Sequence, residues 1–502
     1  MVSGADRPQP AADFVRLHAC GRPNATAIHD ASDGRKWSYG ELDRAIDAAA
    51  SLLDAMGIRQ GTRIAALSRN SPELIILQLA CARLGAILAP LNWRLSRAEI
   101  ALLLADCEPA LLFGDAMIEL AGETGLPKLN AEVFSARLGE RVPARFEPVD
   151  AGLPSLMLYT SGTSGRPKGV LLSEANLLAT AVNFAVIGAV SAESAFLLDS
   201  PMFHVIGMVT NIRPTLLMGG RIIVSRGFDP ATTLARLGDP ALAITHYFCV
   251  PQMAEMLRAC PDFDPERLRG LKAIFTGGAP HAAARIREWL ADGIAIVDGY
   301  GMTEAGTVLG MPLDRERIAA KAGSAGLLPP TVEARIADGE DREVPPGAVG
   351  ELQLRGANIF AGYWRRPEET SQAFAADGWF RTGDLVRRDD DGFFFLAGRT
   401  KEMFISGGEN VYPVEIESAL KSHEAVADAA VVGVEDEKWG EVGHAFVVLR
   451  PGAAAGEAEL RAHCDGCLAR YKHPKVIHFV DDLPRTGTGK VVKGELKALA
   501  IG

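Results

Sequence analysis

The stretch LYTSGTSGRPKGV, residues 158–170, begins with an apolar residue, continues through glycines and hydroxyl side chains, and ends in Pro-Lys-Gly-Val. Successive backbone N–H groups in such a loop can converge on phosphate oxygens, while hydroxyls add donors and a lysine adds positive charge. The composition therefore predicts a phosphate-binding loop. A flexible Gly/Ser surface linker is the alternative that the loop alone leaves open.

The loop departs from the P-loop pattern at its end. A P-loop places Lys directly after its second glycine and follows it with Ser or Thr, which holds magnesium. Here Gly165 is followed by Arg166, Pro167 and Lys168, and Gly169 stands where the hydroxyl would be. Pro167 also lacks a backbone N–H. The P-loop form is excluded, and the surrounding sequence must decide what the loop binds.

On both sides of the loop, helix-like stretches alternate with short apolar runs. Between residues 37 and 92 the helix-like segments YGELDRAIDAAASLLDAMG and SPELIILQLACARLGA alternate with RIAALS and AILAPL. The same rhythm returns between residues 155 and 303, with candidate strands SLMLY, AFLLDS, RIIVS, THYFCV, LKAIFTG and AIVDGY. This alternation predicts an α/β fold in which two packed α/β subdomains contain mostly parallel sheets.

The pattern changes after about residue 329. Short alternating runs with turn residues, such as VEARIAD and PPGAVGELQLRG, predict a small antiparallel, β-barrel-like subdomain. A new α/β pattern starts in residues 398–420, with a helix expected near Pro413, and continues through the strand-like runs DAAVVGV, GHAFVVLR and VIHFVDD. We therefore predict a large N-terminal domain over residues 1–400 and a small mobile α+β domain over residues 401–502.

Composition limits the class of protein. The 502 residues are 48% hydrophobic and carry a formal charge of −11, which predicts more than one domain and disfavours nucleic acid or anionic membranes as partners. Seven scattered cysteines and the lack of a signal-peptide pattern favour the cytoplasm. No apolar run reaches the roughly 18 residues of a membrane span, so we expect a soluble protein.

Cys464 and Cys467 form a single C-x-x-C beside His463. This spacing occurs in zinc and redox sites, but without a second pair a structural role is favoured.

Four further segments give the loop a context. They are DGYGMTEAG (298–306), GWFRTGDL (378–385), GRTKEMFISGGENVYPVEIE (398–417) and LPRTGTGKVVK (483–493). In this order and at these separations, the five motifs resemble the adenylate-forming (AMP-binding) superfamily, in its branch of acyl-CoA synthetases or fatty or aryl acid–CoA ligases. The resemblance spans nearly the whole chain. It implies that a carboxylic acid attacks the α-phosphate of ATP to give acyl-AMP and pyrophosphate, after which the thiol of coenzyme A takes the acyl group.

The resemblance also implies roles for individual residues. Glu304 would bind Mg²⁺ as a hard oxygen donor, and Thr303 would reach the α-phosphate. Asp384 would accept both ribose hydroxyls with help from Arg399, and Lys490 would bridge the attacking carboxylate and the α-phosphate. Tyr300 would offer a ring face to adenine and Asp298 would meet its edge. The other implied ATP-binding residues are Thr160, Ser161, Gly162, Thr163, Ser164, Gly165, Lys168 and Gly301.

The family hinge falls on Lys401, where rotation of the small domain would replace Lys490 by a thiol channel. Glycine in the segment ISGGEN would permit a close approach of pantetheine to the backbone. The implied coenzyme A contacts are Ser406, Gly407, Gly408, Trp439, Tyr471, His473 and Lys475.

The implied acid pocket is apolar. PMFHVIGM, residues 201–208, lacks the aspartate with which amino-acid-activating relatives hold the substrate amine, and ALAITHYFCVP, residues 241–251, lacks an arginine for a second carboxylate. A fatty, aryl or alicyclic acid is therefore favoured. The candidate walls are Phe184, His204, Val205, Phe248, Gly278, Gly301 and Met302.

Two alternatives stay open. The acyl group could be transferred to the phosphopantetheine of a carrier protein instead of coenzyme A, or the chain could be a non-catalytic module that binds a nucleotide or an acyl group. The sequence does not choose an oligomeric state.

Overall fold

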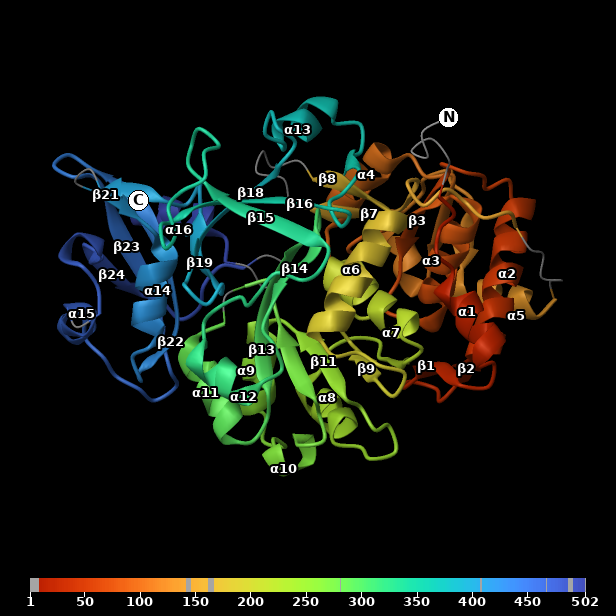
Figure 1. Ribbon diagram of the computed structural model, residues 1–502, viewed down its shortest axis with the longest axis horizontal. Coiled ribbons are helices and arrows are strands. Elements are labelled where there is room, and N and C mark those ends of the chain that lie inside the picture. The colour runs from red at the N-terminus through yellow and green to blue at the C-terminus, as the bar shows by residue number, and fades with distance from the viewer. Residues whose placement is uncertain are drawn as a thin grey trace.

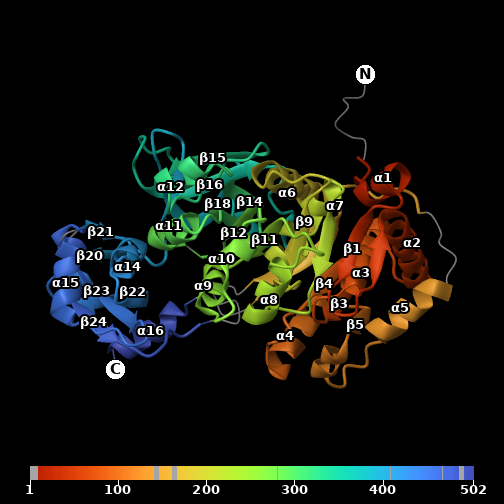
Figure 2. The same cartoon turned by 90° about the horizontal axis from the view of Figure 1, so that it is seen from below.

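The computed structural model of the chain describes residues 9–140, 146–160, 167–279, 281–406, 409–465, 467–485 and 491–501. Over these residues, four β-sheets with helices between them form an α/β molecule, and they confirm the predicted fold class. Three sheets make up most of the molecule, and the fourth, drawn in blue, lies at the end opposite helices α1 to α5 (Figure 1, Figure 2).

The first sheet contains the strands on both sides of the glycine-rich loop. Its strand order is β17 (Gly362–Tyr363), β8 (Lys168–Ser173), β7 (Pro154–Thr160), β4 (Ile87–Pro90), β3 (Arg63–Leu67), β5 (Leu111–Gly114) and β6 (Lys128–Asn130). The strands from β7 to β6 are parallel, whereas β7, β8 and β17 pair antiparallel. β4 and β5 are buried along their whole length, as expected for parallel strands with helices on both faces.

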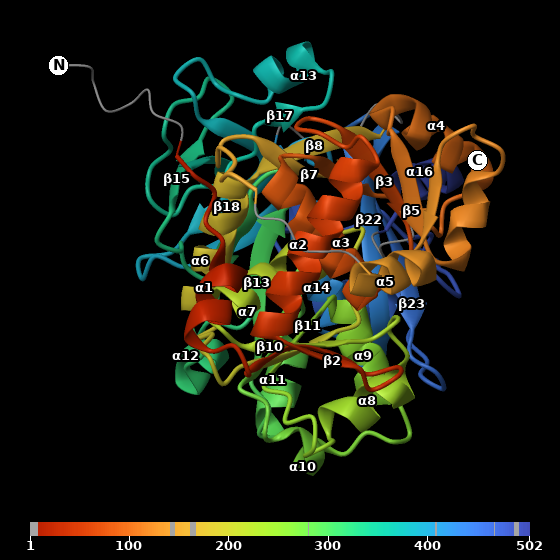
Figure 3. The same cartoon turned by 90° about the vertical axis from the view of Figure 1, so that its right-hand side faces the viewer.

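The helices around this sheet begin and end at residues that favour helix termini. Helix α3 (Pro72–Leu84) starts with Pro72 after the N-cap Ser71, whose hydroxyl accepts from Leu74 N, and it ends at Gly85 with a φ of 69°. The neighbouring helices are α1 (Phe14–Gly21), α2 (Tyr39–Ala55), α4 (Arg97–Cys107) and α5 (Ala131–Glu140), with the 3₁₀ helix η1 (Ala116–Ala121). Helices α2 and α3 pack side by side (Figure 3).

The second sheet is parallel except at its two edge strands. Its order is β14 (Gly306–Gly310), β13 (Ile296–Met302), β12 (Ala273–Thr276), β11 (His246–Cys249), β9 (Ala195–Leu198), β10 (Arg221–Val224), β1 (Thr26–Asp30) and β2 (Lys36–Ser38). Each strand proposed from residues 155–303 is present. Because the carboxyl ends of parallel strands share one edge, the segments after β9, β11, β12 and β13 meet there.

The helices of this part include α6 (Glu174–Ile187), which contacts β14 and the π-helix η2 (Ile206–Thr210). The others are α7 (Arg213–Leu217), α8 (Pro230–Leu237), α9 (Pro251–Ala259), α10 (Pro265–Leu268), α11 (Ala283–Ala291) and α12 (Arg315–Ala320).

The third sheet is the predicted antiparallel region after residue 329. Its order is β15 (Val332–Ala337), β16 (Gly350–Gly356), β18 (Phe380–Arg388) and β19 (Phe394–Arg399), and β15 and β19 are its edge strands. Helix α13 (Pro367–Gln372) lies between β17 and β18 in the chain.

The fourth sheet has its own apolar core, which includes Phe404, Val431, Ala445 and Leu460. Its strands are β21 (Glu409–Val411), β20 (Phe404–Ser406), β23 (Gly440–Leu449) and β22 (Val426–Asp436), with β24 (Val476–Phe479) parallel to β23. Its helices are α14 (Pro413–Lys421), α15 (Glu457–Asp465), α16 (Lys493–Ile501) and the 3₁₀ turn η3 (Arg470–Lys472). Helix α14 begins at Pro413, as the sequence predicts.

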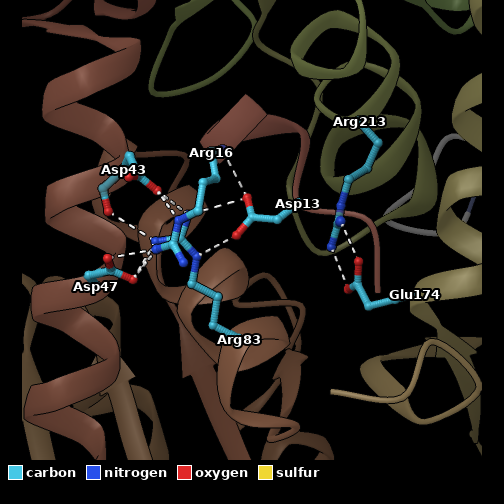
Figure 4. Close-up of polar contacts among 7 residues, drawn as sticks. All are labelled: Asp13, Arg16, Asp43, Asp47, Arg83, Glu174 and Arg213. Atoms are coloured by element: carbon cyan, nitrogen blue, oxygen red, sulfur yellow. Dashed lines mark hydrogen bonds and ion pairs between the residues drawn. The ribbon is translucent and has the colours of Figure 1, made fainter. Parts of the chain in front are cut away.

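Charged side chains join the first three helices (Figure 4). Arg83 Nη1 and Arg16 Nη2 lie 2.7 and 2.6 Å from the same Asp47 oxygen, and both arginines also contact Asp43. Arg83 further binds Asp13. We call these five residues the α1–α3 charge network. It links helices that come from different parts of the sequence.

A separate buried pair is formed by Arg213, from α7, and Glu174, the first residue of α6. Two guanidinium nitrogens of Arg213 donate to the two Glu174 oxygens at 2.8 and 2.9 Å (Figure 4).

In the part of the chain that the structure describes, no helix has the length and apolar content needed to cross a bilayer.

Candidate active site

The glycine-rich loop connects two strands of one hairpin. Thr160, the last residue of β7, pairs with Lys168, the first residue of β8. A P-loop instead joins a strand to a helix. The strand-to-strand connection therefore agrees with the sequence argument from Pro167 and Gly169, which excluded a P-loop. The loop candidates Ser161, Gly162, Thr163, Ser164 and Gly165 lie outside the described residues.

Glu304 occupies the turn between β13 and β14, next to Thr303. It is 8% exposed. Tyr363 Oη donates to Glu304 Oε1 at 2.9 Å, and Lys168 Nζ lies 5.0 Å from the centre of the Tyr363 ring. The backbone of the turn is also held, since Phe360 N donates to Glu304 O at 2.7 Å. One continuous set of contacts thus runs from the base of the glycine-rich loop to Glu304.

Asp384 and Arg399 face each other in the antiparallel pair β18–β19. Arg399 Nε donates to Asp384 Oδ1 at 2.9 Å, and Tyr300 Oη donates to Asp384 Oδ2 at 2.6 Å. Burial and the charge of Asp384 raise the pKa of the Tyr300 phenol well above its usual value, so it remains a donor at neutral pH. The negative charge of Asp384 raises the pKa of Arg399. Asp384, which is predicted to bind the ribose, therefore contacts both Arg399 and Tyr300, the residue predicted to face the adenine.

Asp298 lies in β13, opposite Thr276, the last residue of β12. Thr276 Oγ1 donates to its Oδ1 at 3.1 Å, and His281 N donates to its Oδ2 at 3.2 Å. Burial raises the pKa of this carboxyl to about 7. A nucleobase contact at this position would therefore be made by a carboxyl group that changes its charge near neutral pH.

Phe184 and Phe248, two of the candidate acid-binding residues, belong to an aromatic cluster. Their ring centres lie 5.7 Å apart, and Phe275 is 5.0 Å from Phe184. Gly278 has a φ of 85°, and a methyl group added at its Cα would lie 3.7 Å from the Val250 side chain and 3.9 Å from that of Ile206. The end of β12 therefore offers room beside apolar side chains.

The remaining acid-binding candidates lie on neighbouring segments. His204 precedes η2 and packs against Phe203, with ring centres 4.5 Å apart. Val205 and Met302 are half-buried against the main core, whereas Gly301 is exposed in β13. All four lie after β9 or at the end of β13, at the sheet edge where the carboxyl ends of the strands meet.

The described coenzyme A candidates form a second group, on the fourth sheet. Ser406 pairs with Gly440, the residue after Trp439, and Trp439 is 47% exposed in the turn between β22 and β23. Lys475 binds Asp436 at the start of the same turn. Tyr471 in η3 is 44% exposed, and His473 Nε2 contacts Leu468 O at 3.2 Å. Gly407 and Gly408 lie outside the described residues.

The predicted hinge is at the surface, and the predicted lysine is not among the described residues. Lys401 is exposed between β19 and β20. Lys490 belongs to residues 486–490, which lie outside the described ranges, so its position stays a prediction.

Three residues that contact the candidates were not expected from the sequence. They are Tyr363, Thr276 and His281. Tyr363 stands in the segment AGYWRRPEET, and Thr276 and His281 flank the run GGAP. An aromatic residue followed by a run of charge is not distinctive by itself, and only the pairing of β17 with β8 brings Tyr363 to Glu304.

The residues present fit a magnesium ion that is held mainly by substrate phosphates. Over the described residues, no group of three or more His, Cys, Asp or Glu side chains is placed to hold a metal. Mg²⁺ in phosphoryl-transfer sites usually takes one or two carboxylates together with phosphate oxygens and water. Glu304 beside the glycine-rich loop supplies such a carboxylate.

The C-x-x-C segment has other contacts. Cys464 is buried and Cys467 is exposed, both as free thiols. His463 Nε2 contacts Ser422 Oγ at 2.8 Å and Ala419 O at 3.0 Å. These contacts place His463 in the packing of α14 against α15.

Comparisons with known proteins cover nearly the whole chain. Residues 15–364 match the family model described as AMP-binding enzyme, and residues 415–490 match the model described as AMP-binding enzyme C-terminal domain. The chain is 39% identical over 479 residues to a feruloyl-CoA synthase of Amycolatopsis sp, covering 95% of this chain and 96% of that protein. It is 38% identical over 505 residues to an indoleacetate–CoA ligase of Aromatoleum aromaticum, covering 97% of each. The crystal structure of ATP-bound MatB from Rhodopseudomonas palustris superposes with a TM-score of 0.89 at 34% identity, covering 98% of this chain and 99% of that one.

Proposed function

Because this chain belongs to the adenylate-forming superfamily of AMP-binding enzymes, in its coenzyme A ligase branch, we propose that it activates an apolar carboxylic acid as an acyl-adenylate. It is an acid–thiol ligase that forms acyl-CoA with ATP. The observation that carries the proposal is the β13–β14 hairpin, which bears both Tyr300, bonded to Asp384, and Glu304, bonded to Tyr363. Tyr300, which holds the proposed ribose ligand Asp384, and the proposed metal ligand Glu304 thus lie four residues apart on one hairpin.

The first half-reaction requires two anions to approach each other. A carboxylate oxygen of the acid attacks the α-phosphorus of ATP, the bond from that phosphorus to the bridging oxygen breaks, and pyrophosphate leaves. Glu304 would hold Mg²⁺, which would supply positive charge to the phosphates. Asp384 orients the ribose by accepting from its hydroxyls, Thr303 donates to the α-phosphate, and Lys168 lies at the base of the loop that holds the leaving pyrophosphate.

The second half-reaction exchanges the mixed anhydride bond of acyl-AMP for a thioester. The sulfur of coenzyme A attacks the acyl carbonyl, the bond from that carbon to the AMP oxygen breaks, and the thiol proton is released. Trp439, Tyr471, His473 and Lys475 are proposed to contact the nucleotide of coenzyme A after the small domain has turned. Ser406, with Gly407 and Gly408, is proposed to line the path of the pantetheine.

The proposed hinge at Lys401 is supported by the contacts on either side of it. Thr400 N and Oγ1 both donate to Gly383 O, at 3.0 and 3.2 Å, which ties residue 400 to the third sheet. Glu402 pairs with Lys493 of α16 at 2.8 Å, which ties residue 402 to the fourth sheet's helices. One residue therefore separates two anchored segments, and we propose domains over residues 1–400 and 401–502.

Variants of the two lysines separate the half-reactions. Lys490→Ala is expected to abolish acyl-AMP formation but to preserve thioester formation from supplied acyl-AMP. Lys401→Pro is expected to do the reverse, because a fixed φ restricts rotation. Stopped-flow assays of each half-reaction give the measurement, and equal loss of both steps in both variants would contradict the rotating domain.

The acid is proposed to be an aryl or arylalkyl monocarboxylic acid. Phe184, Phe248 and Phe275 pack on one another and are at most 9% exposed, and an aromatic wall of this kind favours a planar apolar substrate. The names of the relatives, a feruloyl-CoA synthase and an indoleacetate–CoA ligase, agree with such a substrate. Fatty and alicyclic acids are the alternatives.

An acid panel tests the proposal. Purified protein is given ATP, Mg²⁺, coenzyme A and, in turn, ferulate, indoleacetate, benzoate, octanoate or cyclohexanecarboxylate, and pyrophosphate and acyl-CoA are measured. Acid-dependent pyrophosphate release followed by an aryl-CoA is the expected result. Replacing coenzyme A by a phosphopantetheinylated carrier protein distinguishes the carrier-loading alternative, and absence of pyrophosphate release with every acid would support a non-catalytic module.

A further inference from the structure

Tyr363 is placed between two parts of the proposed ATP site, although no motif pointed to it. Its strand β17 pairs antiparallel with β8, so that Tyr363 lies opposite Val170, two residues after Lys168. Its hydroxyl donates to Glu304 Oε1 at 2.9 Å, and its ring lies 5.0 Å from Lys168 Nζ. One side chain therefore contacts the proposed metal ligand and the proposed phosphate-loop lysine.

The segment that carries Tyr363 also holds the backbone of the Glu304 turn. Phe360 N donates to Glu304 O at 2.7 Å, and Asn358 Nδ2 donates to Ala305 O at 2.7 Å. Tyr363 itself is held by Thr370, whose hydroxyl accepts from Tyr363 N at 2.9 Å. Both the main chain and the side chain of Glu304 are thus positioned from residues 358–363.

The hydrogen-bond donor to Glu304 is a neutral phenol. A phenol O–H fixes one carboxylate oxygen without bringing a positive charge, whereas an arginine or lysine would neutralise the carboxylate. The ring face attracts Lys168 through its quadrupole and holds the ammonium near the start of β8.

We propose that Tyr363 is a positioning residue that orients Glu304 toward the metal bound to the ATP phosphates and holds Lys168 beside the glycine-rich loop. This inference rests on the proposed role of Glu304. It assigns a separate function to each contact of Tyr363. The hydroxyl orients the proposed metal ligand Glu304, and the ring positions Lys168, which is proposed to bind the nucleotide phosphates.

The test uses two substitutions at this position in the full chain. Tyr363→Phe removes only the hydroxyl, and Tyr363→Leu removes the ring as well. Binding of Mn²⁺ in the presence of AMP-PCP, a non-hydrolysable ATP analogue, is measured by electron paramagnetic resonance. Loss of one hydrogen bond to a charged group is expected to weaken Mn²⁺ binding about tenfold in Tyr363→Phe. The KM for the acid should stay within about twofold of the original, because no contact with the acid is removed.

The second substitution separates the ring from the hydroxyl. Tyr363→Leu should show the same loss of Mn²⁺ affinity and, in addition, a severalfold higher KM for ATP, because Lys168 loses its ring contact. Equal KM values for ATP in the two variants would overturn the role assigned to the ring.

Two controls make the result decisive. Tyr247→Phe removes a phenol that donates to Asp199 at 3.2 Å in the second sheet, and it should leave Mn²⁺ affinity unchanged. Glu304→Gln tests the premise: unchanged Mn²⁺ affinity in this variant would reject the metal role of Glu304 in the proposed function. Weakened Mn²⁺ binding in Glu304→Gln, with unaltered binding in Tyr363→Phe, would overturn the inference about Tyr363 alone.

Discussion

The carboxylates of the α1–α3 charge network and those of the candidate active site are held in different ways. Asp13, Asp43 and Asp47 share the guanidinium groups of Arg16 and Arg83 (Figure 4). In the candidate site, the contacts described for Glu304 and Asp298 come from neutral donors: a phenol, a hydroxyl and a backbone N–H. Neutral donors fix a carboxylate without adding charge, whereas guanidinium groups place a positive charge beside it.

Asp384 has one contact of each kind, with a neutral donor and with a guanidinium group. It accepts from the neutral phenol of Tyr300 and from one nitrogen of Arg399, whose side chain is half exposed. The buried pair Glu174–Arg213 is instead bidentate, with each side chain at most 6% exposed. The number of guanidinium contacts and their burial therefore differ between the buried pair Glu174–Arg213 and Asp384, the predicted ribose ligand.

The largest expected effect is on stability. Arg83→Ala should lower the free energy of unfolding by about 3 kcal/mol, because it leaves Asp43 and Asp47 with fewer cationic partners in a partly buried position. Urea unfolding followed by circular dichroism measures the change, and the KM for ATP should stay the same. The exposed Arg97→Ala, at the start of α4, is the control and should shift stability by no more than about 0.5 kcal/mol. A raised KM for ATP in Arg83→Ala would break the comparison.

The next effect is on catalysis. Asp384→Asn keeps the shape of the side chain but removes the charge that would accept from the ribose hydroxyls. We expect kcat/KM for ATP to fall about 100-fold, equivalent to about 2.7 kcal/mol. Pyrophosphate release at limiting ATP is the measurement. Asp47→Asn is the matched substitution in the α1–α3 charge network, and it should lower the melting temperature without changing kcat/KM.

A pH effect of intermediate size is expected from Asp199, which is buried beside Thr233 and Tyr247. Burial raises its pKa from 3.8 to about 7. The folded state therefore binds more protons than the unfolded state between these values, so stability should fall as pH rises from about 4 to about 7 and then level off.

Asp199→Asn cannot ionise and should reduce this fall by roughly 2 kcal/mol between pH 5 and pH 7. The measurement is the free energy of unfolding of both proteins across this range. Parallel pH profiles would contradict the expected titration of Asp199.

The smallest effect concerns Arg399. Arg399→Lys keeps the positive charge but loses the planar group that donates through Nε to Asp384. Because the side chain is half exposed, we expect only about a fivefold rise in the KM for ATP, or about 1 kcal/mol. Steady-state kinetics measure it. A loss as large as that of Asp384→Asn would show that Arg399 itself contacts the substrate.

Local sequence signals predicted the elements of the fold well. Proline at an early helical position marked the start of α14, and the apolar runs RIAALS and AILAPL marked the strands β3 and β4. Residues that repeat a local geometry carry their signal within a few positions, so such elements can be recognised without knowledge of the partners they pack against.

The contacts of the candidate site could not be predicted in the same way. Motifs placed Glu304 and Asp384 in functional segments, but the donors that hold these side chains are 59 and 84 residues away in the chain. Those pairings depend on β17 lying beside β8 and on β13 approaching β18. Neither approach leaves a periodic pattern in the sequence.

The cross-strand pair Asp384–Arg399 has a consequence for the order of events. Both residues precede Lys401, the proposed hinge, and Gly383 O accepts from Thr400 as well, so the proposed ribose contacts belong to the part of the molecule that would stay still in the proposed rotation. Acyl-AMP formed in the first half-reaction would then remain bound while the acceptor thiol replaces the lysine. The intermediate need not dissociate and rebind, which protects a reactive mixed anhydride from water and makes a single binding event serve both halves of the cycle.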